Sequence, residues 1–397
     1  MQPFIHSKRP VHIEFRGIVL NIAQDFTFLS KRIAIADKIK HIRQQLNLKY
    51  QVIDRISVVI YHEERNTLQT YVLDEDHDSQ FSNYEVSFSK CQSLFQIAQN
   101  KTARIVNDMS VFSNNKKAHT QQVEMAGYLS SFTMPLFYDN KLLGFFFVNS
   151  HKKNALCDEL TESLGYIAVM VSLVLQQDLS DINILKSTIE SMKLISQYRD
   201  PETGEHLKRM AYYSLLIARK IATKYQLSDE FIEHLFLYAP LHDLGKLMIP
   251  DAILLKSSKL SVDEFKHMKL HTTKGSELVE KLVNIYQLHN MPFIEVLKNI
   301  VCYHHEQIDG GGYPHGLTGK EIPIEAKIVA VADIFDALTS NRPYKKAWSN
   351  NQAFEELYRM SANKIEFEFV HALDHSRGDI EEIQQLFQDE IHDWTQA

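Results

Sequence analysis

Histidine and aspartate stand together where an apolar stretch of this 397-residue chain ends. His242 and Asp243 directly follow a segment that contains Leu235, Leu237 and Leu241. An imidazole and a carboxylate at the end of a buried helix cost free energy unless a partner satisfies them. Neutral imidazole and carboxylate are good ligands for a divalent cation, and a carboxylate can bridge two cations. The pattern predicts a metal site; a capped helix with a His–Asp hydrogen bond is the alternative.

Three more segments supply ligands of the same type. His271 stands alone in the segment HMKLHTTKG, where a single helical histidine is usually structural. His304 and His305 end another apolar helix. Adjacent helical side chains point about 100° apart, so this pair suits two neighbouring metal positions or one metal at an irregular helix end. Asp333 follows an apolar run that must be buried, where a carboxylate needs a partner.

A weaker pair precedes them. Asp200 and Pro201 favour the start of a helix, because aspartate caps and proline suits the first turn. Glu202 and His206 are then four residues apart and share one helix face. The pair is either a further metal site or a solvated ion pair.

Cations accompany the candidate ligands. Lys246 lies in the segment HDLGK, and Arg342 and Lys345 lie in SNRPYKKAW. Cations beside a carboxylate-rich metal site would suit a phosphate, whereas a basic surface loop is the plainer interpretation. The glycine-rich loop 309–314 allows close backbone approach but is by itself a generic turn.

The elements that position these residues change along the chain. The first part is predicted to be α/β, and the second, after Asp200, all-helical. The expected N-terminal elements are a helix over Ile33–Leu46, strands over Ile56–Tyr61 and Thr67–Leu73, and a hairpin of Ser131–Phe137 with Leu142–Asn149 that turns through Asp139–Lys141. The expected C-terminal helices are Thr203–Lys224, Asp229–His242, Val262–Val283, Pro292–His305, Ile324–Ser340 and Asn351–Met360.

A long apolar seam joins the two parts. Apolar residues recur at helical spacing from Leu160 to Met192, with an interruption at Asp178. We favour a dimeric connector, because the seam joins a strand-rich segment to a helical one; two helices packed within their own domains are the alternative. The predicted domains are residues 1–155, a connecting helix 156–199, and residues 200–397.

Composition narrows the classes of function. The hydrophobic fraction is 44%, the charged fraction 23% and the formal net charge −7, which argues against a DNA- or RNA-binding protein. Three widely spaced cysteines suit a reducing cytoplasm. The N-terminus lacks a signal-peptide pattern, and the most apolar run, Leu164–Leu175, is too short for a membrane span. We therefore expect a cytoplasmic protein without a membrane span.

The ordered motifs from Arg199 to Trp348 resemble one family. They read RDPETGEH, LHDLGKLMIPDAILLK, HTTKG, HHEQIDGGGYPHGLTG and VAVADIFDALTSNRPYKKAW. This order is similar to the HD superfamily of metal-dependent phosphohydrolases, and more narrowly to its HD-GYP branch. The resemblance implies a cyclic di-GMP phosphodiesterase whose end product is either linear pGpG or GMP. Some members prefer cyclic GMP-AMP. A receptor that binds without cutting and a hydrolase of mononucleotides are the rival functions.

The resemblance also implies roles for single residues, with Asp243 and Lys246 as the catalytic pair and Asp243 as the bridge between two metals. The implied metal ligands are Glu202, His206, His242, Asp243, His271, His304, His305 and Asp333, where Glu202 and His206 would hold a third ion. The implied substrate contacts are Lys246, Arg342, Lys345, Gly312, Tyr313 and Pro314. Two or three divalent ions are expected, iron or manganese because no thiolate is present. Two ions roughly 3.5–4 Å apart would make a hydroxide available near neutral pH to attack phosphorus.

Two regions stand apart from this pattern. The segment from Lys364 to Ala397 is longer than the family's usual ending, is acidic, and lacks its Gly-x-x-Phe-Asp-Pro-like stretch, which leaves the C-terminal packing open. The N-terminal half resembles a GAF domain around Met134–Leu136 and Leu143–Gly144. That resemblance implies either a sensor of an unknown small ligand or a dimerisation scaffold, in a homodimer that signals through shifted helix packing.

Overall fold

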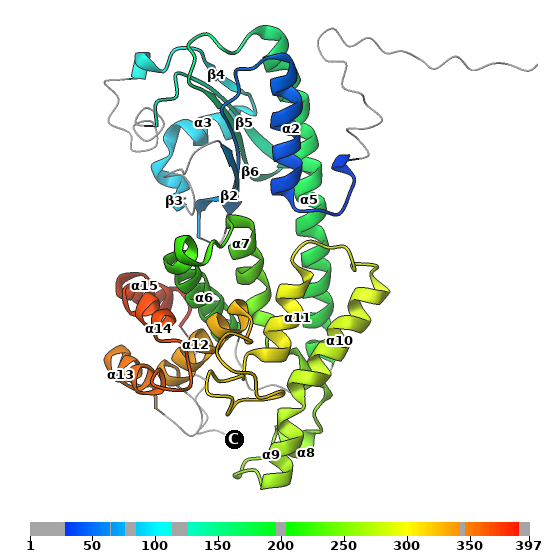
Figure 1. Cartoon of the computed structure of the whole chain (residues 1–397), viewed down its shortest axis with the longest axis vertical. Coiled ribbons are helices and arrows are strands. Elements are labelled where there is room, and N and C mark those ends of the chain that lie inside the picture. The colour runs from blue at the N-terminus through cyan, green and yellow to red at the C-terminus, as the bar shows by residue number, and fades with distance from the viewer. Residues whose placement is uncertain are drawn as a thin grey trace, which may run out of the picture. The chain divides into compact units, whose positions relative to one another are not determined.

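The computed structural model describes residues 28–63, 65–75, 85–112, 126–195, 204–341 and 346–388. The chain divides into two compact units. Unit 1 comprises Met1–Lys31 with Ile35–Gln176, and unit 2 comprises Arg32–Ala34 with Gln177–Ala397. Unit 1 carries the sheet, whereas unit 2 contains helices and no strand among its described residues (Figure 1). The predicted fold class, an α/β half followed by a long helix and an all-helical half, is confirmed.

Unit 1 is built on a six-stranded antiparallel sheet in the order β3-β2-β1-β6-β5-β4. The strands are β1 (Arg55–His62), β2 (Thr67–Glu75), β3 (Glu85–Ser87), β4 (Arg104–Val106), β5 (Ser130–Tyr138) and β6 (Lys141–Ser150). The predicted hairpin is β5–β6, and Asp139 and Asn140 at its turn both have positive φ. Two such residues match the turn that joins twisted antiparallel strands, so the expectation is confirmed.

Helices cover both faces of this sheet. On one face, α2 (Ile35–Lys49) contacts β1 and β2 and buries Ile35, Ile39 and Ile42. On the other, the short η1 (Phe88–Lys90) and α3 (Gln92–Asn100) form a second cluster with Phe145 and Phe147. A short turn, η2 (Met109–Phe112), follows β4.

The predicted connector is one continuous 38-residue helix, α5 (Asp158–Ile195), which passes Asp178 without a break. The division between the two units falls within it, after Gln176. Its dimeric role and the predicted domain limits stay predictions. Within α5, Asp158–Leu185 is long and apolar enough to cross a membrane by length and composition, with 44% of the window buried inside the structure. A core helix passes the same test.

Unit 2 surrounds α6 (Gly204–Tyr225), which contacts α7 (Asp229–Tyr238), α12 (Ile324–Thr339) and α14 (Phe367–Asp374). Its other helices are α8 (Asp251–Leu254), α9 (Val262–Lys269), α10 (His271–Ile285), α11 (Ile294–Tyr303), α13 (Asn350–Met360) and α15 (Arg377–Leu386). Two short 3-10 turns, η3 (Ala239–Leu241) and η4 (Leu244–Met248), follow α7.

Two predicted helices differ from the structure. The helix expected over Asp229–His242 ends at Tyr238, because Pro240 lacks a backbone N–H and stands at the start of η3. The helix expected over Val262–Val283 is interrupted at Leu270, and α10 starts afresh at His271. Both corrections place candidate ligands at irregular helix ends.

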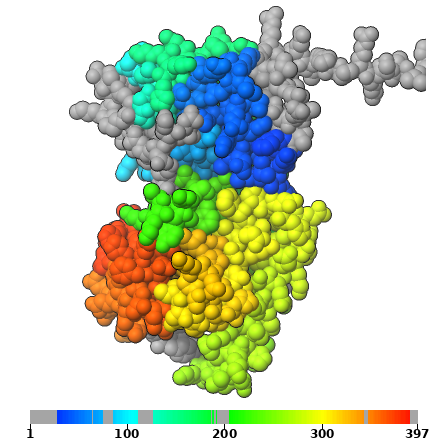
Figure 2. All heavy atoms as spheres, in the orientation of Figure 1, coloured from blue at the N-terminus to red at the C-terminus, as the bar shows by residue number. Residues whose placement is uncertain are grey.

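The C-terminal segment that the sequence left open packs into the core of unit 2 as far as α15. Phe354 on α13, Phe369 on α14 and Ile380 on α15 are buried in the same cluster as Tyr213 of α6. In Figure 2 the orange and red atoms of α13–α15 are continuous with the yellow and amber atoms of unit 2.

Candidate metal centre

The HD segment is pressed against the start of α10 through a glycine. A Cβ atom at Gly245 would lie 1.7 Å from the carbonyl oxygen of His271 and 2.6 Å from the amide nitrogen of Gly275. Only a residue without a side chain permits this approach. The contact brings Asp243, which immediately precedes η4, beside His271 at the first position of α10.

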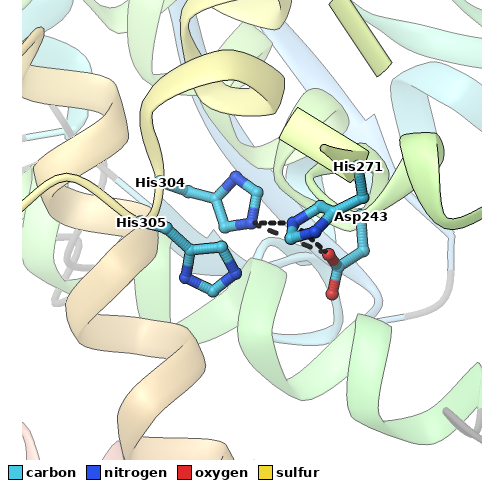
Figure 3. Close-up of side chains that lie close together, drawn as sticks. All are labelled: Asp243, His271, His304 and His305. Carbon is cyan, nitrogen blue, oxygen red and sulfur yellow. Dashed lines mark hydrogen bonds and ion pairs between the residues drawn. The ribbon is translucent and has the colours of Figure 1, made fainter. Parts of the chain in front are cut away.

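A first cluster of possible ligands is formed by Asp243, His271, His304 and His305, whose donor atoms lie within 4.8 Å of one another (Figure 3). The Asp243 Oδ1 atom lies 3.2 Å from His271 Nε2 and 3.7 Å from His304 Nε2. The two Nε2 atoms are 3.5 Å apart. His305 is half-buried, and the other three are buried.

A second cluster consists of His206 from α6, His242 after η3, and Asp333 from α12. Its donor atoms also lie within 4.8 Å of one another, and His206 Nε2 is 3.9 Å from Asp333 Oδ1. Asp243 faces this cluster as well, because its Oδ2 atom lies 3.0 Å from His242 Nε2. Each oxygen of one carboxylate is therefore turned to a different group of histidines.

The histidine rings are held so that Nε2 faces the clusters. The Nδ1 atoms of His242, His271 and His304 lie 3.1, 2.8 and 2.9 Å from the carbonyl oxygens of Ala239, Met268 and Ile300. A carbonyl oxygen only accepts, so each Nδ1 donates, and the neutral ring presents its lone pair at Nε2. This second hydrogen bond is typical of metal-binding histidines.

The pKa values of residues in the first cluster also suit metal binding. Burial lowers the pKa of His271 to about 4. Burial, and then the neighbouring His304, hold the pKa of His305 well below its usual range. Burial raises the pKa of Asp243, but Lys246 and His242 outweigh it and hold that pKa well below the ordinary value. Near neutral pH His271 and His305 are therefore neutral and Asp243 is ionised, which are the forms that bind metal.

The donor set fits divalent cations. Both clusters contain only nitrogen and oxygen donors. Ligand atoms bound about 2.0–2.2 Å from one ion must lie roughly 3–4 Å from one another, which is the spacing between these Nε2 and carboxylate atoms. Imidazole and carboxylate donors without a thiolate are compatible with the expected iron or manganese.

The predicted glycine loop lies beside the first cluster. A Cβ atom at Gly312 would lie 2.3 Å from the amide nitrogen of Gln307, so the chain folds back on itself only with glycine there. Glu306 anchors the return by accepting hydrogen bonds from the backbone N–H groups of His315 and Leu317. The ring of Tyr313 lies 4.7 Å from that of His305, and Pro314 follows it through a cis peptide bond.

The structure places the remaining predicted residues as follows. Lys246 Nζ lies 2.8 Å from Asp243 Oδ2. Glu202, Arg342 and Lys345 lie outside the described residues.

Sequence reasoning missed Asp336, which is fully buried and lies 2.7 Å from His206 Nδ1 through its Oδ2 atom. It stands three residues after Asp333 in the same apolar helix. A buried carboxylate in an apolar run was the signal that identified Asp333, and it could have identified Asp336 too.

Comparison with known families agrees with this geometry. Residues 193–368 match the family model described as HD domain. Unit 2 contains an HD domain. The resemblance to HD-GYP phosphodiesterases expected from Arg199 to Trp348 is confirmed by this match and by the named relatives.

The relatives of this HD domain are phosphodiesterases by name. The chain is 41% identical over 198 residues to the cyclic di-GMP phosphodiesterase response regulator RpfG of Xanthomonas campestris, covering 50% of each protein. It is 38% identical over 208 residues to a cyclic di-GMP phosphodiesterase of Thermotoga maritima, covering 52% of this chain and 54% of the relative. It is 35% identical over 188 residues to the 3'3'-cGAMP-specific phosphodiesterase 2 of Vibrio cholerae, covering 47% and 34%. The chain spans about half the length, or less, of these relatives.

Solved structures similar to the chain include GAF domains. A phycocyanobilin-bound GAF domain from a cyanobacterial phytochrome has a TM-score of 0.33 at 13% identity, covering 39% of this chain and 92% of that one. The GAF domain of an Acinetobacter phosphoenolpyruvate-protein phosphotransferase has a TM-score of 0.32 at 12% identity, covering 41% and 94%. Likeness at this level says nothing of a ligand, so ligand binding by unit 1 stays a prediction.

Proposed function

We propose that the HD domain is a metal-dependent phosphodiesterase that opens cyclic di-GMP to linear pGpG and cuts it further to GMP. The observation that carries the proposal is the position of Asp243 between two histidine clusters, with one carboxylate oxygen toward each. A carboxylate placed in this way suits two neighbouring cations. Two metal ions are the usual means of stabilising both the attacking and the leaving oxygen of a phosphoryl transfer.

In this proposal Asp243, His271, His304 and His305 hold one cation, and the second cluster of His206, His242 and Asp333 holds the other with the second oxygen of Asp243. A third ion would require Glu202 beside His206. When bound, iron or manganese would supply a nucleophile near neutral pH and positive charge for the phosphoryl oxygens. The backbone hydrogen bonds at Nδ1 keep three of the rings in the required tautomer before any ion arrives. The protein therefore provides a preformed set of donors.

The substrate is proposed to lie against the same face of the site. Lys246 carries its ammonium group 2.8 Å from Asp243, where it can neutralise a phosphate beside the clusters. Arg342 and Lys345 would add further cations. The loop at Gly312, Tyr313 and Pro314 stands beside His305 and can wall the site next to a base or ribose.

Further proposals concern the whole protein. We propose that it acts in the cytoplasm as a homodimer, and that unit 1 regulates hydrolysis as a GAF-like sensor through α5. The widely spaced cysteines and the apolar seam of α5 support the first proposal, and the sequence resemblance around Met134–Leu136 to a GAF domain supports the second.

The test is anaerobic incubation of the full chain with cyclic di-GMP and either Mn(II) or Fe(II), with products separated by chromatography. We expect pGpG, and then GMP, from the wild type and about 10²–10³-fold slower product formation from Asp243→Asn. Asp263→Asn is a matched control, because the Asp263 side chain is 85% exposed on α9.

The same assay distinguishes the rival functions. Cleavage of cyclic GMP-AMP with cyclic di-GMP left intact would reassign the substrate and keep the phosphodiesterase. Binding of cyclic di-GMP without cleavage under either metal would replace the enzyme by a receptor. Hydrolysis of mononucleotides alone would contradict the proposed substrate class.

A further inference from the structure

His206 differs from the other histidines of the centre in how its ring is held. His242, His271 and His304 bond through Nδ1 to backbone carbonyl groups three or four residues earlier in their own turns. His206 instead bonds through Nδ1 to a side chain on another helix, the Oδ2 atom of Asp336, at 2.7 Å. The orientation of His206 therefore depends on a residue that mutation can change.

The bond fixes which nitrogen of His206 carries the proton. An ionised carboxylate only accepts hydrogen bonds, so Nδ1 must donate, and in the neutral ring, the form that binds a metal ion, Nε2 then presents its lone pair. That Nε2 atom faces the second cluster, 3.9 Å from Asp333 Oδ1. A carboxylate behind a histidine in this way orients the ring and makes it a stronger ligand.

Asp336 is itself held by a buried guanidinium. Arg209 Nε lies 2.7 Å from Asp336 Oδ1, and Arg209 Nη2 lies 3.0 Å from Oδ2. Such a two-point contact sets the plane of the carboxylate. The hydroxyl of Ser340 donates a further bond to Oδ2 at 2.9 Å. Asp336 is 0% exposed and Arg209 is 4% exposed, so water does not loosen the arrangement.

The network ends at the C-terminal helix. Arg209 Nη1 donates to the carbonyl oxygen of Phe387 at 2.7 Å, immediately after α15. The ring of Phe387 stacks on Tyr212 with 5.3 Å between centroids and 12° between planes. The end of α15 thus braces the arginine that orients Asp336.

From this geometry we propose that Asp336 is a positioning residue for the second cluster, held by Arg209 and the end of α15, and that its carboxylate sets how tightly His206 binds a metal ion. The proposal rests on the metal-dependent function proposed above, but only through the second cluster. The alternative is a buried ion pair that serves folding alone.

The experiment is a titration of the metal-free full chain with Mn(II), with free Mn(II) followed by electron paramagnetic resonance. His206→Ala identifies the second cluster, and His271→Ala the first. We expect Asp336→Asn to weaken Mn(II) binding at the second cluster by about 10–100-fold and to leave the first unchanged. Glu325→Gln is the matched control, because Glu325 is a buried carboxylate of the same helix bonded to Asn299.

A double-mutant cycle separates positioning from folding. If Asp336 acts through His206, then His206→Ala with Asp336→Asn loses no more Mn(II) affinity than His206→Ala alone. Additive losses would overturn the proposal, as would equal loss at both clusters or unchanged binding in a folded Asp336→Asn protein. If Asp336→Asn fails to fold, Arg209→Lys provides a second test, because it keeps the charge but not the two-point contact with Asp336. We expect it to weaken Mn(II) binding at the second cluster alone.

The outcome is independent of hydrolysis. A protein that binds Mn(II) at both clusters and loses only the second in Asp336→Asn supports the inference even if it cleaves no cyclic dinucleotide. Selective loss of Mn(II) binding without any cleavage would contradict the proposed function but would still support the positioning role of Asp336.

Discussion

At the scale of single residues, the centre depends on Asp243 more than on any one histidine. Its Oδ1 faces His271 and His304, and its Oδ2 faces His242 and Lys246. Removing one histidine would leave the other donors of both clusters in place. Removing the carboxylate's charge weakens both clusters together.

Asp243→Asn is therefore expected to lower metal content at both clusters and hydrolysis by about 10²–10³-fold, since bound metal contributes several kcal/mol of transition-state stabilisation. Metal content after dialysis and initial rates of hydrolysis measure the two effects. Loss of hydrolysis with full metal content would mean that Asp243 acts on the substrate and not as a bridge.

The sequence predicted the candidate ligands of the metal centre better than the groups that orient their side chains. Buried carboxylates and histidines at helix ends are visible in a single chain, because apolar neighbours mark them as costly. The partners of Nδ1 are backbone carbonyls or, for His206, a carboxylate 130 positions away. Backbone partners leave no mark on residue type, which is why the orientation of each ring had to come from the structure.

At the scale of elements, the site is assembled by the contact of η4 with α10. Gly245 and Gly275 lie at this contact, where a Cβ on Gly275 would lie 3.0 Å from the amide nitrogen of Gly245. Both glycines stand inside sequence motifs. That they allow η4 and α10 to approach each other closely could be seen only in the structure. Similarly, the 3-10 turns after Tyr238 follow from Pro240, whose effect on the helix end the apolar pattern concealed.

Gly245→Ala should separate η4 from α10, because its Cβ would overlap the carbonyl oxygen of His271. We expect weaker metal binding at the first cluster, measured by Mn(II) titration, and a lower melting temperature. Gly378→Ala in α15 is the control: no atom lies within 4 Å of its added Cβ, and alanine favours the helix by up to about 1 kcal/mol. Equal Mn(II) affinities and equal melting temperatures in the two variants would contradict the proposed role of Gly245 in the contact of η4 with α10.

At the scale of the whole molecule, the C-terminal helices α13–α15 share the hydrophobic core of unit 2. The sequence beyond Trp348 departs from the family's ending, so only the structure shows α13–α15 within the core. Of these helices, α14 and α15 contact α6 directly. Both tryptophans of the chain follow residue 176 in the sequence, and Trp348 lies among the described residues of unit 2, so its fluorescence follows the unfolding of this unit.

Phe369→Ala tests whether α14 belongs to the hydrophobic core of unit 2. Phe369 is 0% exposed on α14, and truncating a buried phenylalanine costs about 3–5 kcal/mol of unfolding free energy. Phe367→Ala is the matched control, because Phe367 is 56% exposed two residues away. Denaturant unfolding followed by tryptophan fluorescence should show a large decrease in unfolding free energy for Phe369→Ala and a small change for Phe367→Ala. Equal shifts would mean that α14 is not part of the core.

The buried histidines also make the metal-free protein sensitive to acid. The pKa of His271 is about 4 when folded, against about 6.5 when unfolded, because burial disfavours the charged ring. Between these values the unfolded chain binds more protons, so stability is fully present above about pH 6.5 and falls as the pH drops toward 4. His305, whose pKa is also lowered by burial, adds to the same trend.

We expect the unfolding free energy of the metal-free chain, measured by tryptophan fluorescence in urea, to be lower at pH 5 than at pH 7.5. Each such histidine contributes a slope of at most about 1.4 kcal/mol per pH unit within this window. His271→Asn, which cannot take up that proton, should show a smaller difference between the two pH values. An unchanged difference between the two pH values in His271→Asn would mean that other groups govern the acid sensitivity.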